Sequence, residues 1–123
     1  MIRLDSVSKA FGDVRALDGV VCAINAASLV AIVGANGSGK TTLLRLIAGV
    51  IAPESGSVRV HGVDPRATST RRDARFGYAG QHVALDPEMT GAETLRLFHA
   101  LRGLASSSRS ECIASLVAMY DLA

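Results

Sequence analysis

Apolar and polar positions alternate over several stretches in the first half of the chain. After a turn signal at 12–13, residues 14–24 form a second extended stretch. Residues 1–8 show the alternating pattern, and residues 57–61 repeat it later. A period of two places successive side chains on opposite faces of an extended backbone, so each stretch predicts a half-buried strand. A further turn signal, at 18–19, falls inside the second stretch. Together these segments predict an N-terminal antiparallel β-region.

An uninterrupted apolar run over 28–33 is rich in β-branched residues and ends at Gly34. Such a run predicts a strand that is covered on both faces, as in a parallel sheet. From Lys40 onward, apolar residues recur at helical spacing, which predicts an amphipathic helix that ends near Gly49. A covered strand followed directly by a helix indicates an α/β fold.

The second half of the chain is predicted to be mostly helical. Residues 63–75 are polar and predict an exposed loop or a short polar helix, and residues 76–79 predict a short strand. Apolar spacing predicts one helix over 92–102. A last helix is predicted after the capping-box pattern of Ser108 and Glu111.

Composition narrows the class of protein. The chain has 123 residues, of which 49% are hydrophobic and 20% charged, which is typical of one globular domain. A net charge of +2 supplies no broad basic field, so no nucleic-acid partner is expected. No apolar run reaches the roughly 18 residues of a membrane-spanning helix, and the first residues do not resemble a secretory signal. Cys22 and Cys112 are interpreted as buried free thiols, and the chain is expected in the cytoplasm.

A phosphate-binding motif lies between the apolar run and the first predicted helix. Residues 34–41 fit G-x-x-x-x-G-K-[ST] at every fixed position. Glycines let the backbone bend around an anion, and the following helix N-terminus adds partial positive charge. The chain has only two lysines against eleven arginines, so arginine is its usual basic residue. A lysine in this loop is therefore less expected by chance. The motif predicts a nucleoside triphosphate site.

Each side chain of the motif has an expected role. Lys40 is expected to reach the terminal phosphates, where it also serves catalysis, and the Thr41 hydroxyl to ligate Mg²⁺. Thr42 is expected to contact the α-phosphate. The residues expected to contact the nucleotide in this loop are Gly34, Ala35, Asn36, Gly37, Ser38, Gly39, Lys40, Thr41 and Thr42.

Segments outside the loop carry a resemblance to a known family. Residues 9–17 precede the loop by about the length of a hairpin, Gln81 follows the polar insert, and residues 85–95 come next. With the loop itself, these segments resemble the ATP-binding subunit or domain of an ABC transporter over essentially the whole chain. The resemblance implies that Phe11 stacks on adenine. It also implies that Gln81 contacts Mg²⁺ and the attacking water as a catalytic residue, and that residues 82–95 face a membrane partner.

The resemblance implies an activity and an organisation. The fold would be a P-loop NTPase core with the antiparallel β-region, over about 1–90, followed by the start of a helical subdomain over about 91–123. The complete protein would be an ATPase that uses ATP and Mg²⁺, dimerises with a second ATP-binding domain and drives a transmembrane permease. It would lie on the cytoplasmic face of the membrane, and the run 86–91 favours an exporter.

Three motifs of the family do not occur in this sequence. These are the signature motif, the apolar strand that ends in an acidic pair, and the switch histidine. The chain is therefore expected to be the N-terminal part of one ATP-binding domain, truncated before the helical subdomain is complete. It is expected to bind ATP without turning it over. In addition, Ala27 stands where the family usually has glycine, so a turn suited to glycine carries a side chain there.

Two other functions share part of these features. A P-loop kinase or phosphotransferase would need arginines over the phosphates, and the polar insert carries four of them: Arg66, Arg71, Arg72 and Arg75. An ABC ATPase that acts on nucleic acid or the ribosome would share the front-end motifs. The short insert before Gln81 carries no coiled-coil heptads, which favours the transporter.

Overall fold

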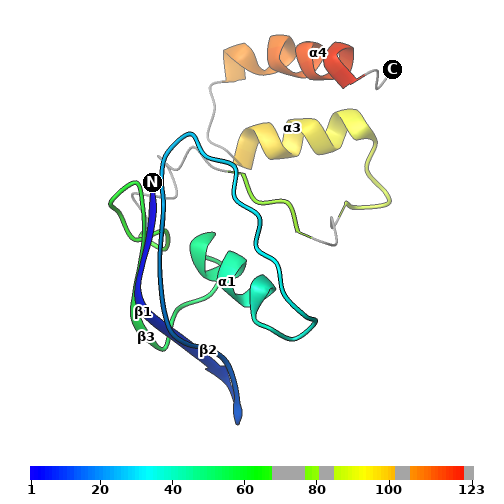
Figure 1. Cartoon of the computed structure of the whole chain (residues 1–123). Helices are drawn as coiled ribbons and strands as arrows, with labels where there is room; N and C mark the ends of the chain where they lie inside the picture. Colours follow the sequence, from blue (N-terminus) through cyan, green and yellow to red (C-terminus); the bar gives the residue numbers. More distant parts are fainter. Residues whose placement is uncertain (68–76, 81–84, 102–105, 121–123) are drawn as a thin grey trace. The chain divides into compact units, whose positions relative to one another are not determined.

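The computed structural model describes residues 1–67, 77–80, 85–101 and 106–120 of the chain (Figure 1). Its contacts divide the chain into two compact units, Met1–Phe76 and Gly77–Ala123. Each unit is described by itself.

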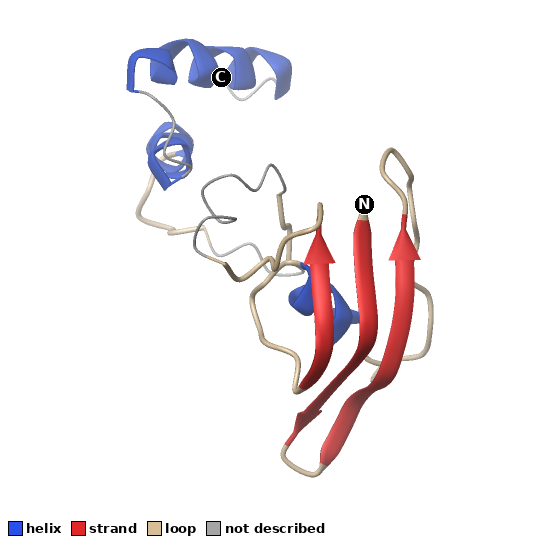
Figure 2. Ribbon diagram, turned by 90° about the vertical axis from the view of Figure 1, so that its left-hand side faces the viewer, coloured by secondary structure: helices blue, strands red, loops and turns tan. Residues whose placement is uncertain are grey.

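The first unit is built on a three-stranded antiparallel sheet. Its strands are β1 (Ile2–Phe11), β2 (Val14–Ile24) and β3 (Ser55–Val60), in the order β2-β1-β3 (Figure 2). The predicted antiparallel β-region is therefore confirmed. The first strand runs three residues further than its alternation indicated, and a tight turn at 12–13 joins it to β2 as predicted.

The turn signal at 18–19 marks a bulge rather than a turn. The register shifts on both sides of the Lys9–Leu17 pair, because Ala16 is an extra residue on one side and residues 18–19 oppose the single residue Ser8 on the other. Gly19 adopts a φ of +57°, and its N–H donates to Ser8 Oγ at 2.9 Å. A bulge bends the strand and increases its local twist while the pairing continues.

Helix α1 (Lys40–Ile47) packs on one face of this sheet (Figure 2). Its Leu46 side chain is only 1% exposed. The core joins strand and helix residues: Leu4, Val7, Leu17, Leu46 and Val58. The helix ends at the predicted place, because Gly49 takes a φ of +68°. Gly49 also lies close to Pro65, where a Cβ would be 2.6 Å from the Pro65 carbonyl oxygen.

The apolar run 28–33 is not a strand, which corrects the prediction made from its composition. Leu29 is 103% exposed, Val30 52% and Val33 87%, so the segment is not covered on both faces. A buried parallel strand requires hydrogen-bonded neighbours on its edges. Among the described residues, β2 and β3 each pair with β1, and no strand pairs with 28–33. Residues 77–79 likewise form no strand, and Phe76 lies outside the described residues.

The second unit consists of helices. These are α3 (Gly91–Leu101), the short 3-10 helix η1 (Ser106–Ser108) and α4 (Arg109–Tyr120), as the apolar spacing predicted (Figure 1). Thr90 and Glu93 form a reciprocal cap at the start of α3, with Glu93 Oε2 accepting from the Thr90 N–H at 2.8 Å. No helix in the described part of the chain is long and apolar enough to cross a membrane.

Candidate nucleotide-binding site

The loop that precedes α1 contains a tight turn closed by its own backbone. The Ser38 N–H donates to the Ala35 carbonyl oxygen at 3.2 Å. Gly37 and Gly39 adopt φ values of +83° and +87°, a region that side chains with a Cβ rarely occupy. A Cβ at Gly34 would lie 2.7 Å from Ser38 Oγ. The loop is therefore a shape that glycine permits and that added side-chain atoms would fill.

Gly39 ties this loop to the sheet. A Cβ at this position would lie 2.5 Å from the Ala16 carbonyl oxygen and 2.8 Å from Leu17 Cδ2. Both neighbours belong to the bulged part of β2. The bulge of β2 and the start of α1 thus meet at a backbone contact that only glycine allows. A Cβ at Gly37, by contrast, would have no atom within 4 Å, so this position faces open space.

Lys40 folds back over the loop that precedes it. Its Nζ donates to the Gly34 carbonyl oxygen at 2.8 Å and to the Ala35 carbonyl oxygen at 2.6 Å. An ammonium group has three donors, so a third remains for an anion that enters the loop. The hydrogen bonds hold the positive charge at the loop.

The N-terminus of α1 presents its partial positive charge without compensation. Gly39 is the N-cap and provides no side-chain cap, and the first turn contains no acidic residue. Thr41 is exposed and Thr42 is half-buried in this turn. Backbone N–H groups, an ammonium group and two hydroxyls are a donor set that suits a phosphate chain.

A metal ion would find few protein ligands here. The described residues contain no group of three or more His, Cys, Asp or Glu side chains that could hold one. The Thr41 hydroxyl is exposed and suits Mg²⁺, which is usually held by few protein ligands together with substrate phosphates. Gln81, the other predicted metal ligand and catalytic residue, lies outside the described residues.

Phe11 ends β1 on the hairpin that also contacts Gly39. It pairs with Val14 across the hairpin and is 49% exposed. The Nζ atom of Lys9 lies 5.3 Å from the centroid of its ring. Sequence reasoning did not assign a role to Lys9, although a lysine two residues before an aromatic residue on a strand is the signal that would have found it.

Of the four arginines that a kinase would need over the phosphates, Arg66 is already paired. Arg66 Nε and Nη2 donate to Asp64 at 3.1 and 2.8 Å, and these hydrogen bonds hold the pKa of the Asp64 carboxyl below its usual range. Arg71, Arg72 and Arg75 lie outside the described residues.

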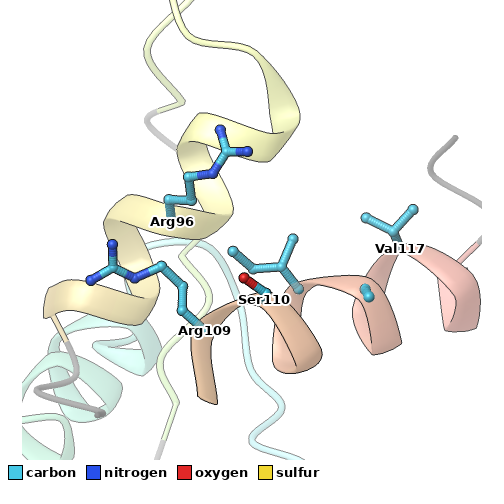
Figure 3. A pocket seen from close by; sticks show the side chains of 6 residues that line it. Arg96, Arg109, Ser110 and Val117 are labelled. Carbon is cyan, nitrogen blue, oxygen red and sulfur yellow. The ribbon is translucent and has the colours of Figure 1, made fainter. Parts of the chain in front are cut away.

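The second unit carries a groove of about 280 Å³ between α3 and α4 (Figure 3). Arg96 of α3 and Arg109 of α4 lie at one part of it, and Arg109 extends toward α3. The groove is lined by Arg96, Arg109, Ser110, Ile113, Ala114 and Val117. Within the described residues, Arg109 Nε is buried without a hydrogen-bond partner, as are both ring nitrogens of His99, which packs in α3. The groove thus combines positive charge with an apolar wall.

The fold and the loop place the chain among the P-loop proteins. It is similar to a solved structure described as the dimeric structure of MJ0796, a bacterial ABC transporter cassette, with a TM-score of 0.75 and 29% identity. That similarity covers 90% of this chain and 53% of the other. Residues 17–123 match the family described as ABC transporter, and the chain belongs to that family.

Curated relatives show the same family membership, as the sequence predicted. The chain is 34% identical to the daunorubicin resistance ATP-binding protein DrrA3 of Streptomyces coeruleorubidus, over 99% of this chain and 39% of that protein. It is 42% identical to the sulfate/thiosulfate import ATP-binding protein CysA of Anthoceros angustus, over 80% of this chain and 26% of that protein. The chain therefore spans only a minor part of these relatives' length.

Proposed function

We propose that this chain is the ATP-binding part of an ABC transporter and that it binds ATP with Mg²⁺ at residues 34–42. The observation that carries the proposal is the loop itself. Lys40 is held over it by two hydrogen bonds, and an uncapped helix N-terminus follows it. Both features favour the binding of a negatively charged phosphate group.

Within this site each group has a separate task. Lys40 places its remaining donor on the terminal phosphates, and the Thr41 hydroxyl supplies one ligand to Mg²⁺. Phe11 offers a ring face to adenine at the end of β1. Gln81, which lies outside the described residues, would contact Mg²⁺ and the attacking water as the resemblance implies. The metal would neutralise phosphate charge when bound, and the residues named here bind and orient the nucleotide.

Replacement of Lys40 tests the site. Charge-assisted hydrogen bonds contribute about 1.5–3 kcal/mol, so Lys40→Ala should weaken ATP binding about 10- to 150-fold. Arg45→Ala removes a positive charge from the last turn of the same helix and is the matched control. Fluorescent ATP is titrated against the three proteins in the presence of Mg²⁺. Equal affinity of wild type and Lys40→Ala would overturn the assignment.

We further propose that the complete protein hydrolyses ATP as a dimer and that this chain alone does not turn it over. Family membership supports the activity, and the dimeric solved structure supports the assembly. Charge stabilisation at the γ-phosphate requires several preorganised groups, and loss of one typically lowers the rate about 10²–10³-fold. Phosphate release by this chain is expected to equal that of its Lys40→Ala variant. Turnover near about 1 s⁻¹ that depends on Lys40 would contradict the proposal.

The resemblance assigns residues 82–95 to the permease, and we propose that the groove between α3 and α4 contributes to the same surface. Its two arginines suit a carboxylate of the permease. Its apolar wall, formed by Ile113, Ala114 and Val117, suits apolar side chains of the same partner. Arg96→Glu is expected to weaken association with membranes that contain the cognate permease. Arg45→Glu, on a helix of the other unit, is the matched control. Equal loss in both variants would indicate a general charge effect and contradict the assignment.

The direction of transport is proposed to be export. The match to the daunorubicin resistance protein covers nearly all of this chain, whereas the match to the sulfate importer covers 80% of it. Transport in membrane vesicles made with the complete protein and its permease decides the direction. ATP-driven accumulation of substrate inside inverted vesicles is expected, and its absence there with uptake in right-side-out vesicles would refute export.

A further inference from the structure

A lysine lies against the aromatic residue that would stack on the base. Lys9 Nζ is 5.3 Å from the centroid of the Phe11 ring, within the range of a cation–π contact. The ion pairs of the described residues are Arg3–Asp5, Arg15–Asp18 and Arg66–Asp64. None of these engages Lys9, so in the described part of the chain the ring is the contact that the structure gives this ammonium group.

Strand geometry places both side chains on the side of the phosphate loop. Residues two apart on a strand point to the same face, and β1 carries no extra residue between Val7 and Phe11, because the shifts there fall on β2. Val7, Lys9 and Phe11 therefore share one face. Val7 is in the core beneath α1, and the cross-strand partner of Lys9 is Leu17, which approaches Gly39 of the loop.

An aromatic ring has two faces, and the ammonium group takes one of them. Phe11 remains 49% exposed, so ring surface is still open to a ligand. We infer that Lys9 is a positioning residue for the base, because its ammonium group holds the Phe11 ring from one face and leaves the opposite face to adenine. The inference rests on the proposed function, since it requires that ATP binds at the loop.

Lys9 acts on the fraction of protein in which the Phe11 ring has the conformation that binds adenine. An exposed cation–π contact biases the ring toward one rotamer by about two- to fivefold. The apparent affinity of a ligand is reduced in proportion to the fraction of protein in the binding conformation. Loss of the ammonium group should therefore weaken ATP by about two- to fivefold through the base, without any change at the phosphates.

The test compares ATP with inorganic tripolyphosphate, which carries the phosphates and no base. Binding of both ligands, with Mg²⁺, is measured by calorimetry for wild type, Lys9→Met, Lys9→Arg and Phe11→Leu. Methionine keeps the length and apolar stem of lysine without its charge, and arginine keeps the cation. The double variant K9M/F11L shows whether Lys9 acts through Phe11.

The expected result is specific to the base. Lys9→Met weakens ATP by about two- to fivefold and leaves tripolyphosphate unchanged, and Lys9→Arg restores ATP binding. In the Phe11→Leu background, Lys9→Met causes no further loss of ATP affinity. Equal loss of both ligands would show that Lys9 acts on the phosphates. Unchanged or tighter ATP binding would show that the ammonium group does not hold the ring or covers the face that the base needs. Either result overturns the inference.

The same titrations separate this inference from the proposed function. A wild-type chain that binds neither ligand overturns the loop assignment, and the inference falls with it. Binding of both ligands, with at least a fivefold loss of ATP in Phe11→Leu and none in Lys9→Met, keeps the proposed function and overturns the role of Lys9 alone; that fivefold figure is about the lower end of a base–aromatic stack.

Discussion

Two glycines of the phosphate loop have nearly the same φ angle and different surroundings, so their substitutions can be compared directly. Gly37 and Gly39 have φ values of +83° and +87°. Alanine in this region is strained by about 1–2 kcal/mol at either position. Only at Gly39 would the added Cβ meet other atoms, at 2.5 Å from the Ala16 oxygen and 2.8 Å from Leu17 Cδ2.

The difference in unfolding free energy between the two variants measures the steric cost of an added Cβ where the loop contacts the sheet. A backbone oxygen cannot move aside like the end of a flexible side chain, and overpacking typically adds about 1–3 kcal/mol. We expect Gly37→Ala to lower the free energy of unfolding by about 1–2 kcal/mol, and Gly39→Ala to lower it by about 2–5 kcal/mol.

Urea unfolding without nucleotide, followed by far-UV circular dichroism, measures both values. The slopes of the two variants should agree, because the surface exposed on unfolding is nearly the same, and the midpoint of Gly39→Ala should be the lower. Equal destabilisation by the two variants would show that Gly39 does not pack on the bulge of β2. Hydrogen exchange at the Gly19 amide, which lies in β2, tests whether the loss reaches the sheet.

Two further outcomes concern single local features. Ala27 has a φ of +54°, so Ala27→Gly should raise the free energy of unfolding by about 1 kcal/mol, whereas Ala26→Gly should lower it by about 0.5–1 kcal/mol; urea midpoints check both, and a loss in Ala27→Gly would refute the strain. The hydrogen bonds from Thr90 hold the pKa of Glu93 below its usual value of 4.5. A lowered folded-state pKa stabilises the protein above the unfolded pKa and loses that effect as pH falls through the folded value. The helicity of α3 should therefore decline as pH falls below 4.5, and the decline should be shallower in Thr90→Ala, as circular dichroism against pH would show.

Patterns that depend on near neighbours predicted the structure well. The extended stretch over 14–24 and the helical spacing after Lys40 correspond to β2 and α1. The positive φ of Ala27 was also foreseen, because a turn suited to glycine was known from its place in the resemblance. The turn signal at 18–19 was misinterpreted because the distinction between a turn and a bulge is not local. A glycine with positive φ serves a bulge as well as a turn, and only the pairing with β1 distinguishes them.

The strand predicted over 28–33 failed because its premise is not local. Apolar β-branched residues favour an extended strand only where neighbouring strands supply hydrogen bonds and layers of side chains cover both faces. The described residues supply neither to this segment, and Leu29 and Val33 remain exposed. A sequence window contains the composition of a strand and not its partners.

The candidate site also combines features that depend on local sequence with features that depend on other strands. The spacing of the loop motif is local, so its residues could be named from sequence, while the contact of Gly39 with Ala16 depends on a bulge in another strand. The position of Lys9 against Phe11 required only the period of a strand, although no role was assigned to Lys9 from the sequence. Gln81 lies outside the described residues, so its role stays a prediction.

The two ends of the phosphate loop are held unequally, and this bears on how the site binds its ligand. At its end, Gly39 packs on β2 and α1 packs on the sheet through Leu46. At its beginning, the segment 28–33 is uncovered, and the two hydrogen bonds from Lys40 to Gly34 and Ala35 are the contacts that join the first part of the loop to α1. Lys40 is therefore both the group that meets phosphate and the link across the loop. A phosphate that draws the ammonium group away from these carbonyl oxygens must replace that link by binding to the loop's own N–H groups, which is the arrangement that a backbone cradle provides.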